Sequence, residues 1–293
     1  MKILVLGATG MLGHKLMQVL ANKFEVMGTV RQGTDGFTSH PVLGQMQLVG
    51  GIDAANFDSV INAMANNRPS IVINCIGIIK QVPAGKDPLP SITINALFPH
   101  RLAQLCRAMG TRLIHISTDC VFSGEKGNYT EDDLSDAKDL YGRTKFLGEV
   151  AYLGCLTLRT SIIGRELNTR FGLLEWFLSQ QGNTVSGYTK AIYSGFTTLV
   201  LAELIADVIA KQPDLNGVWH VSSDPISKFD LLRLIKEALN LQIGITPDHL
   251  YACDRSLDST RFRQMVGYIP PDWPQMVSQI TSDLTRYDDM LKG

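Results

Sequence analysis

Cysteine is scarce in this sequence, and no two cysteines stand at the Cys-x-x-Cys spacing. Scattered cysteines in odd number exclude a disulfide framework and a cysteine-based zinc site, and they are typical of a protein kept in a reducing compartment. We therefore expect a cytoplasmic protein. The cysteines are Cys75, Cys106, Cys120, Cys155 and Cys253.

The sequence also lacks an excess of either charge and any long apolar run. Lysine and arginine number 27 against 28 aspartates and glutamates, which argues against nucleic acid or an anionic membrane as a partner. The longest apolar run, residues 71–79, is interrupted by Asn74 and Gly77, whereas a membrane-spanning helix needs about 20 residues. The apolar run after Met1 is too short for a signal peptide.

Apolar residues are plentiful, at 45% of 293 residues, and suffice for a large core and about two domains. Short apolar runs and helix-length segments follow one another over the first 160 residues. Because these runs do not alternate with polar residues, they predict parallel strands covered on both faces. The predicted strands are 3–6, 25–30, 70–75, 112–116 and 155–158, and the predicted helices are 11–20, 57–64, 92–109 (kinked at Pro99) and 140–152.

This pattern predicts an α/β fold with a Rossmann-like, doubly wound parallel sheet over residues 1–160. The rhythm then changes, and loops rich in glycine, proline and aspartate separate the later elements. We expect residues 161–293 to form a smaller C-terminal substrate-binding part, with some segments returning to the first domain. Its predicted helices are 173–179, 199–210 and 228–239, and its predicted strand is 218–221.

The clearest motif is Gly-Ala-Thr-Gly-Met-Leu-Gly at residues 7–13, directly after the first predicted strand. Glycine permits the tight turn, the approach of backbone to a pyrophosphate, and close packing of helix on strand. The N-terminus of the following helix offers free N–H groups to phosphates. A plain strand–helix turn is the alternative, but the position favours a dinucleotide. The predicted cofactor-binding residues of this motif are Gly7, Thr9, Gly10, Met11, Leu12 and Gly13.

The ends of the next strands supply further candidate cofactor contacts. The second strand leads to Arg31, where an NAD site usually has an acidic residue. A guanidinium suits a 2′-phosphate, so NADP(H) is favoured, with NAD(H) tolerated. Asp53, at the predicted end of strand three, either accepts a hydrogen bond from the adenine amino group or caps the following helix. After strand four come Cys75, Ile76 and Gly77, where the glycine either lets the cofactor lie close or is a simple loop residue.

Candidate catalytic groups follow the fifth strand. Tyr141 and Lys145 are four residues apart, hence on one face of a helix. A nearby ammonium favours the phenolate and lowers the pKa of the phenol towards the working range. The spacing itself carries little weight, but its place after strand five, downstream of the glycine motif, does. The segment Ser117-Thr118-Asp119 ends strand five, where doubly wound sheets bind ligands; a simple polar turn is the alternative.

Together these motifs resemble the extended short-chain dehydrogenase/reductases, and most closely the dTDP-4-dehydrorhamnose reductase family, over nearly the whole chain. The resemblance implies that Thr118, Tyr141 and Lys145 are catalytic and that Asn95 contacts the cofactor. Besides the motif at 7–13, it rests on Asn95-Ala96 and on residues 117–124, 141–145, 148–149, 158–161 and 217–229.

The resemblance implies NAD(P)H-dependent reduction of the 4-keto group of a nucleotide-linked 6-deoxyhexose, for polysaccharide precursor synthesis. In that reaction Tyr141 protonates the developing alkoxide, Thr118 bonds the same oxygen, and Lys145 lowers the pKa of the tyrosine and holds the nicotinamide ribose. Three alternatives stay open. They are a UDP-linked 2-acetamido-4-keto-6-deoxysugar as substrate, an epimerase or dehydratase reaction on the same fold, and a non-catalytic subunit like the relative that binds a methionine adenosyltransferase.

The sequence also departs from the family pattern. Cys120 replaces a usual tyrosine and Ile162 a usual tryptophan, both on the sugar side, so the sugar is expected to differ from the rhamnose precursor. We expect Asp119, Cys120 and Ile162 to contact the substrate, and we interpret Lys80 as a solvated lysine rather than a substrate contact. Acidic residues for a magnesium-bridged dimer are not evident and Lys15 follows the glycine motif. No metal is therefore expected, and a homodimer is left open.

Overall fold

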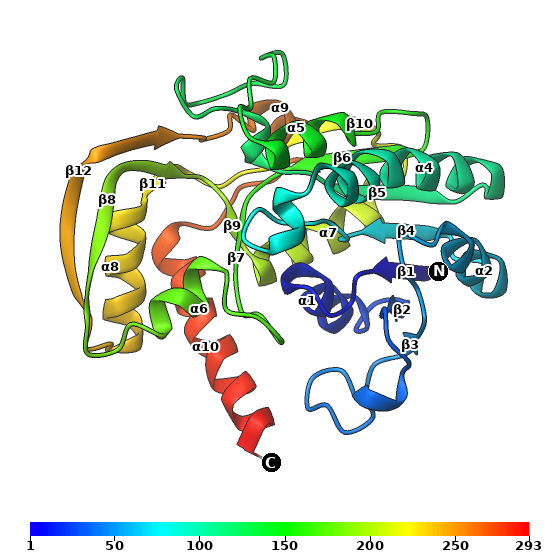
Figure 1. Ribbon diagram of the computed structural model, residues 1–293, viewed down its shortest axis with the longest axis horizontal. Coiled ribbons are helices and arrows are strands. Elements are labelled where there is room, and N and C mark those ends of the chain that lie inside the picture. Colours follow the sequence, from blue (N-terminus) through cyan, green and yellow to red (C-terminus); the bar gives the residue numbers. More distant parts are fainter. Residues whose placement is uncertain (293) are drawn as a thin grey trace.

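A seven-stranded parallel sheet forms the centre of the computed structural model (Figure 1). The structure describes the backbone of residues 1–292 and all of their side chains except those at 285, 286 and 288–292. The strand order is β10-β6-β5-β4-β1-β2-β3. The predicted α/β, doubly wound fold is confirmed. The strands are β1 (Lys2–Leu6), β2 (Glu25–Thr29), β3 (Leu48–Val49), β4 (Ile71–Asn74), β5 (Arg112–Ile116), β6 (Cys155–Arg159) and β10 (Gly217–His220).

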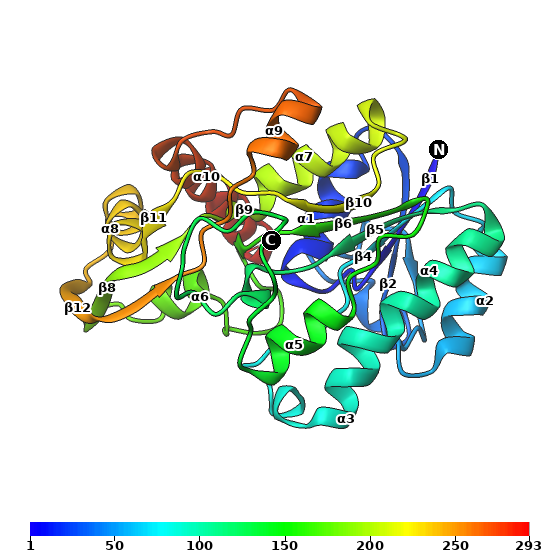
Figure 2. The same ribbon diagram turned by 90° about the horizontal axis from the view of Figure 1, so that it is seen from above.

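Helices cover both faces of the sheet (Figure 2). On one face, α1 (Met11–Leu20) packs against α7 (Thr198–Lys211), and their apolar residues join one large core cluster. On the other face, α2 (Phe57–Asn67) and α4 (Phe98–Met109) share a second cluster. Burial on both sides explains why β1, β4 and β6 are apolar nearly throughout.

The predicted helix 92–109 is interrupted at its start. A short helix, α3 (Pro88–Ser91), runs into a π-helical turn, η3 (Ile92–Leu97), before α4 begins. Pro99 lacks a backbone N–H and so cannot bond the carbonyl of Asn95. The expected kink therefore lies in the turn just before the proline.

The predicted helix 140–152 was too long, because α5 ends at Leu147 (Leu140–Leu147). Gly148 packs directly against the backbone of η3, where an added Cβ would lie 1.9 Å from the Asn95 carbonyl oxygen. This contact requires glycine at position 148, which is the C-cap of α5.

A segment far along the chain completes the central sheet. Strand β10 pairs with β6 in parallel, with Trp219 opposite Leu158 and His220 opposite Arg159. Strand β10 therefore lies at the edge of the central sheet, next to β6. The division into two parts at residue 160, with segments returning to the first, stays a prediction.

The remaining strands form two small sheets. In one, β8 (Thr184–Tyr193) lies between β11 (Ile226–Ser227) and β12 (Gly244–Asp254), and α8 (Lys228–Leu239) packs on β8. In the other, β7 (Ile162–Ile163) pairs with β9 (Phe196–Thr197). The sequence analysis missed β8 and β12. The other helices and turns are α6 (Leu173–Leu178), α9 (Thr260–Val266), α10 (Trp273–Lys292), η1 (Asp35–Phe37), η2 (Pro83–Lys86) and η4 (Asp119–Val121).

No helix in the part of the chain that the structure describes has both the length and the apolar character needed to cross a membrane.

Candidate active site

The candidate site lies at the carboxyl edge of the central sheet. The order of strands reverses between β1 and β4, since β2 and β3 continue on one side and β5 and β6 on the other. In open α/β sheets this switch point opens a crevice at the carboxyl ends of the strands. The loops after β1, β4 and β5 all reach it, and they carry the glycine motif, Gly77 and Thr118.

The glycine motif has the backbone geometry of a dinucleotide cradle. Gly7 has φ +84°, in the region that favours glycine, and a Cβ on Gly13 would lie 2.0 Å from the Gly7 carbonyl oxygen. By contrast, a Cβ on the exposed Gly10 would meet only that same oxygen, at 3.4 Å. The open space beside Gly10 and the free amides at the start of α1 fit the pyrophosphate of a dinucleotide.

The other residues of the motif mainly shape this turn. Leu12 is buried in the core, so it offers a ligand only its backbone. Thr9 and Met11 are half-buried beside the turn. The Gly7 N–H donates to Thr29 Oγ1 at 3.2 Å, which ties the turn to the end of β2. Sequence reasoning missed Thr29, although a hydroxyl at the end of a strand next to the glycine motif was a usable signal.

Arg31 and Asp53 lie beyond the ends of β2 and β3. Arg31 is exposed, two residues after β2 ends. The expectation that Asp53 ends strand three was wrong, because β3 stops at Val49. Asp53 is not the cap of α2 either: the cap position is Asn56, and the Asp53 carboxylate accepts from the Ala55 N–H at 3.0 Å within a local turn.

The loop after β4 is held by an asparagine side chain from η3. Asn95 Oδ1 accepts from the Ile78 N–H at 2.8 Å, and its Nδ2 donates to the Ile78 carbonyl at 2.9 Å. Gly77 is exposed, and a Cβ there would lie 3.4 Å from Asn95 Oδ1 and 3.9 Å from Lys145 Nζ. Ile76 and Cys75 line the same loop, and burial raises the pKa of the Cys75 thiol to about 12. The open surface over Gly77 therefore leads from the glycine turn to Lys145.

Thr118 and Tyr141 are neighbours, and their catalytic role stays a prediction. Thr118 is buried at the start of η4, and Tyr141 stands in the first turn of α5, which the Asp139 carboxylate caps through the Gly142 N–H at 2.7 Å. Burial raises the pKa of the Tyr141 phenol well above its usual range. The neighbouring Cys120 raises it further, while a hydrogen bond with the Thr118 hydroxyl lowers it.

Lys145 is buried one turn along α5. Its ammonium donates to the Ile116 carbonyl at 2.7 Å. Burial lowers the pKa of Lys145 to about 8, against an opposing effect of the Glu149 carboxylate. The largest influences on the pKa of Tyr141 are its burial and its neighbours Cys120, Thr118, Asp119 and Asp139. That Lys145 lowers the pKa of Tyr141 stays a prediction.

A buried network of polar side chains links the elements that form this edge of the sheet. The Ser117 hydroxyl donates to Glu149 Oε1 at 2.7 Å, and Arg159 donates to both carboxylate oxygens of Glu149 at 2.9 and 2.8 Å. Arg159 also contacts Nε2 of His220 at 3.2 Å. Burial and Arg159 lower the pKa of His220 to about 4, so the ring is neutral near pH 7. These residues join β5, α5, β6 and β10, and sequence reasoning assigned none of them to the site.

The predicted sugar-side residues are only partly brought together. Asp119 and Cys120 both lie next to Tyr141 and affect its pKa. Lys80 is exposed but near enough to Cys120 to lower the pKa of that thiol. Ile162 is half-buried in β7 and packs against the large core cluster. Its contact with a substrate stays a prediction.

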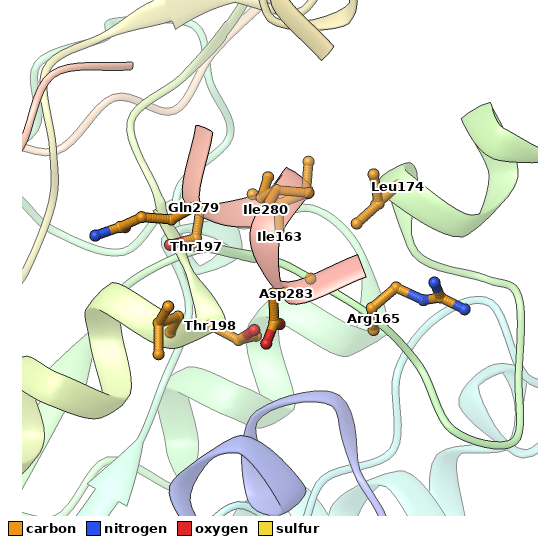
Figure 3. A pocket seen from close by; sticks show the side chains of 10 residues that line it. Ile163, Arg165, Leu174, Thr197, Thr198, Gln279, Ile280 and Asp283 are labelled. Carbon is orange, nitrogen blue, oxygen red and sulfur yellow. The ribbon is translucent and has the colours of Figure 1, made fainter. Parts of the chain in front are cut away.

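Two cavities lie elsewhere. One, of about 10 Å³, is lined by residues of β7, α7 and α10 and has room for about one water (Figure 3). Asp283 points from α10 toward α1, where it pairs with the buried Lys15 at 2.6 Å. The other cavity, of about 430 Å³, lies between α6 and α10 and is lined by Arg170 and Leu241 among others.

Within the described side chains, no group of three or more histidines, cysteines or carboxylates is placed to hold a metal.

Comparison with known proteins agrees with this geometry. The dTDP-4-dehydrorhamnose reductase of Escherichia coli (strain K12) is 26% identical over 312 residues, covering 97% of this chain and 98% of that one. Methionine adenosyltransferase 2 subunit beta of Rattus norvegicus is 25% identical over 252 residues, covering 82% and 72%. The crystal structure of dTDP-4-dehydrorhamnose reductase from Bacillus anthracis in complex with NADP shares the fold, with a TM-score of 0.80, 21% identity, and coverage of 96% and 99%.

One protein family matches almost the whole chain. The family described as RmlD substrate binding domain matches residues 1–285. The expected oxidoreductase class agrees with the two reductases named above, and the one from Bacillus anthracis is in complex with NADP. The resemblance to the dTDP-4-dehydrorhamnose reductase family is confirmed. The chain belongs to the RmlD substrate binding domain family.

Proposed function

We propose that this protein is a cytoplasmic NADP(H)-dependent reductase of the 4-keto group of a nucleotide-linked 6-deoxyhexose. The observation that carries the proposal is the placement of Thr118 beside Tyr141, with Lys145 facing Gly77, at the sheet edge below the glycine turn. A hydroxyl, a phenol and an ammonium are thus gathered where a dinucleotide would end.

The cofactor supplies the hydride when it is bound. Tyr141 gives a proton to the oxygen of the reduced carbonyl, and Thr118 hydrogen-bonds the same oxygen. Lys145, anchored at the Ile116 carbonyl and close to Gly77, would hold the ribose hydroxyls of the bound cofactor through its remaining N–H groups. In the free protein the high pKa of Tyr141 keeps the phenol protonated, which is the form needed for reduction.

Arg31 supports NADP(H) as the preferred cofactor. Its guanidinium is exposed at the end of β2, and no ion pair of Arg31 is found among the described residues. A 2′-phosphate would give it a partner of matching geometry. NAD(H) lacks that phosphate and is proposed to bind more weakly.

The sugar nucleotide is proposed to be dTDP-linked, with the UDP-linked 2-acetamido-4-keto-6-deoxysugar as the second candidate. Cys120, which lies beside Tyr141, favours keeping this alternative, because a thiol fills less space than the tyrosine usual in the family.

The experiment is to mix purified protein with NADPH and dTDP- or UDP-linked 4-keto-6-deoxysugars and to follow absorbance of the reduced nicotinamide. Consumption of NADPH with one of them supports the proposal, and inactivity toward dTDP-, UDP- and GDP-linked keto sugars would overturn it. Stoichiometric NAD released on denaturation would instead indicate an epimerase or dehydratase. Tight NADPH binding without any turnover would indicate a non-catalytic subunit.

A further inference from the structure

The Thr118 hydroxyl is hydrogen-bonded to both of the residues that follow it. It donates to Asp119 Oδ1 at 3.0 Å, in a buried position. The Cys120 N–H donates to Thr118 Oγ1 at 3.1 Å. Thr118 also lies near enough to the Tyr141 phenol to lower its pKa. Asp119 therefore contacts a hydroxyl that neighbours the proposed acid, Tyr141.

The protonation state of Asp119 determines where the Thr118 hydroxyl can donate its proton. A threonine hydroxyl has one proton to donate, and an ionised carboxylate has only acceptors. While Asp119 is ionised, the Thr118 proton points at Oδ1 and is lost to any substrate oxygen. When the carboxyl is protonated, its own O–H donates to Thr118 Oγ1, and the threonine proton is free to turn toward the substrate.

The surroundings of Asp119 favour the protonated form. Within the described side chains Asp119 forms no ion pair, although Arg255 and Lys228 lie near enough to favour its charge. The Arg255 Nε is bonded to the Phe122 carbonyl at 2.8 Å. Burial outweighs both cations and raises the pKa of Asp119. The other titratable groups that face it are the Cys120 thiol and the phenols of Tyr141 and Tyr193.

We propose that Asp119 is a positioning residue that must carry its proton for Thr118 to donate to the substrate oxygen. Asp119 transfers no proton itself; it only sets the direction of the Thr118 hydroxyl. The inference rests on the proposed function, since it concerns the oxygen that the reduction creates.

The kinetic test compares pH profiles. In the wild type at saturating NADPH and substrate, kcat for reduction should fall as pH rises through the ionisation of Asp119. Asp119→Asn keeps a permanent N–H donor toward Thr118, so this step should vanish from its pH profile, whatever its absolute rate. Thr118→Val should lose about 10²–10³-fold in kcat at every pH, and Thr118→Ser should restore it. A step that persists in Asp119→Asn would overturn the inference.

A second measurement does not depend on turnover. Infrared difference spectra between the wild type and Asp119→Asn report the carbonyl band of a protonated carboxyl as pH is varied. Asp139→Asn is the matched control, because it removes a carboxylate near Tyr141 without touching Thr118. We expect the Asp119 band to persist above the pH at which an aspartate with the ordinary pKa of 3.8 ionises. Ionisation of Asp119 at or below that pH would contradict the inference.

The two measurements separate this inference from the proposed function. A wild-type protein that reduces no keto sugar but shows a protonated Asp119 would remove the proposed reaction and keep the hydrogen-bond assignment. An active wild-type protein with an ionised Asp119 would support the proposed reaction and contradict the proposed role of Asp119.

Discussion

The Lys145 ammonium donates to the main-chain carbonyl of Ile116 at 2.7 Å, across from the exposed Gly77. This bond anchors the cation of α5 to the end of β5. A Cβ on Gly77 would lie 3.9 Å from this ammonium. The proposed function assigns the charge of Lys145 to cofactor binding.

Loss of this charge predicts weaker cofactor binding at high pH. Burial lowers the pKa of Lys145 to about 8, so the ammonium is present below that pH and is lost as pH rises through it. We expect the Kd for NADPH to increase and kcat/KM to fall above about pH 8. Lys145→Met should bind NADPH weakly and show no such change with pH. Titration of cofactor fluorescence from pH 6 to 10 measures this. A loss of NADPH binding above about pH 8 that persists in Lys145→Met would contradict the assignment.

Replacement of Tyr141 by phenylalanine should stop turnover without affecting the fold. Removing a positioned proton donor typically costs about 10²–10⁴-fold in rate, whereas cofactor affinity and thermal stability should stay near wild-type values. Tyr152→Phe is the control, since that phenol bonds His100 at 2.9 Å, away from the sheet edge. A Tyr141→Phe variant with wild-type kcat would show that this phenol is not the acid.

Alanine at two glycines of the turn should have different effects. In Gly13→Ala the new Cβ would lie 2.0 Å from the Gly7 carbonyl oxygen, so we expect a large loss of stability or no folded protein. In Gly10→Ala the Cβ has room, at 3.4 Å, but it projects into the space proposed for the pyrophosphate. That variant should melt like the wild type and bind NADPH at least tenfold more weakly. Circular dichroism melts and cofactor titration test the pair, and equal NADPH binding by Gly10→Ala and wild type would refute the cradle.

Arg31→Ala should change cofactor preference rather than activity as such. A hydrogen bond between charged groups contributes about 1.5–3 kcal/mol, so NADPH should bind roughly 10–150-fold more weakly while NADH binding stays the same. Arg107→Ala, at the exposed end of α4, removes an arginine at the opposite edge of the sheet and should change neither. Equal losses for the two cofactors would show that Arg31 does not contact a 2′-phosphate.

Much of the first half of the fold could be predicted from local patterns. Strand β5 and helices α1 and α8 begin and end at the predicted residues, because a buried strand and a glycine-started or serine-capped helix carry their signals in a few neighbouring positions. Strand β8 was missed although its buried residues do alternate, because glycine and alanine occupy two of the buried positions. Strand β12 is mostly exposed and contains a proline, so it shows no pattern of its own.

The sequence by itself determined the sheet, the glycine turn, and the presence of a threonine, a tyrosine and a lysine at one edge, since each depends on short-range spacing. Only the tertiary structure decided what these groups face: Lys145 the Ile116 carbonyl, and Thr118 both Asp119 and Tyr141. It also placed β10 beside β6. Such contacts join residues far apart in the chain or depend on which of several partners a side chain reaches. Packing and burial settle that choice, and the order of residues does not record it.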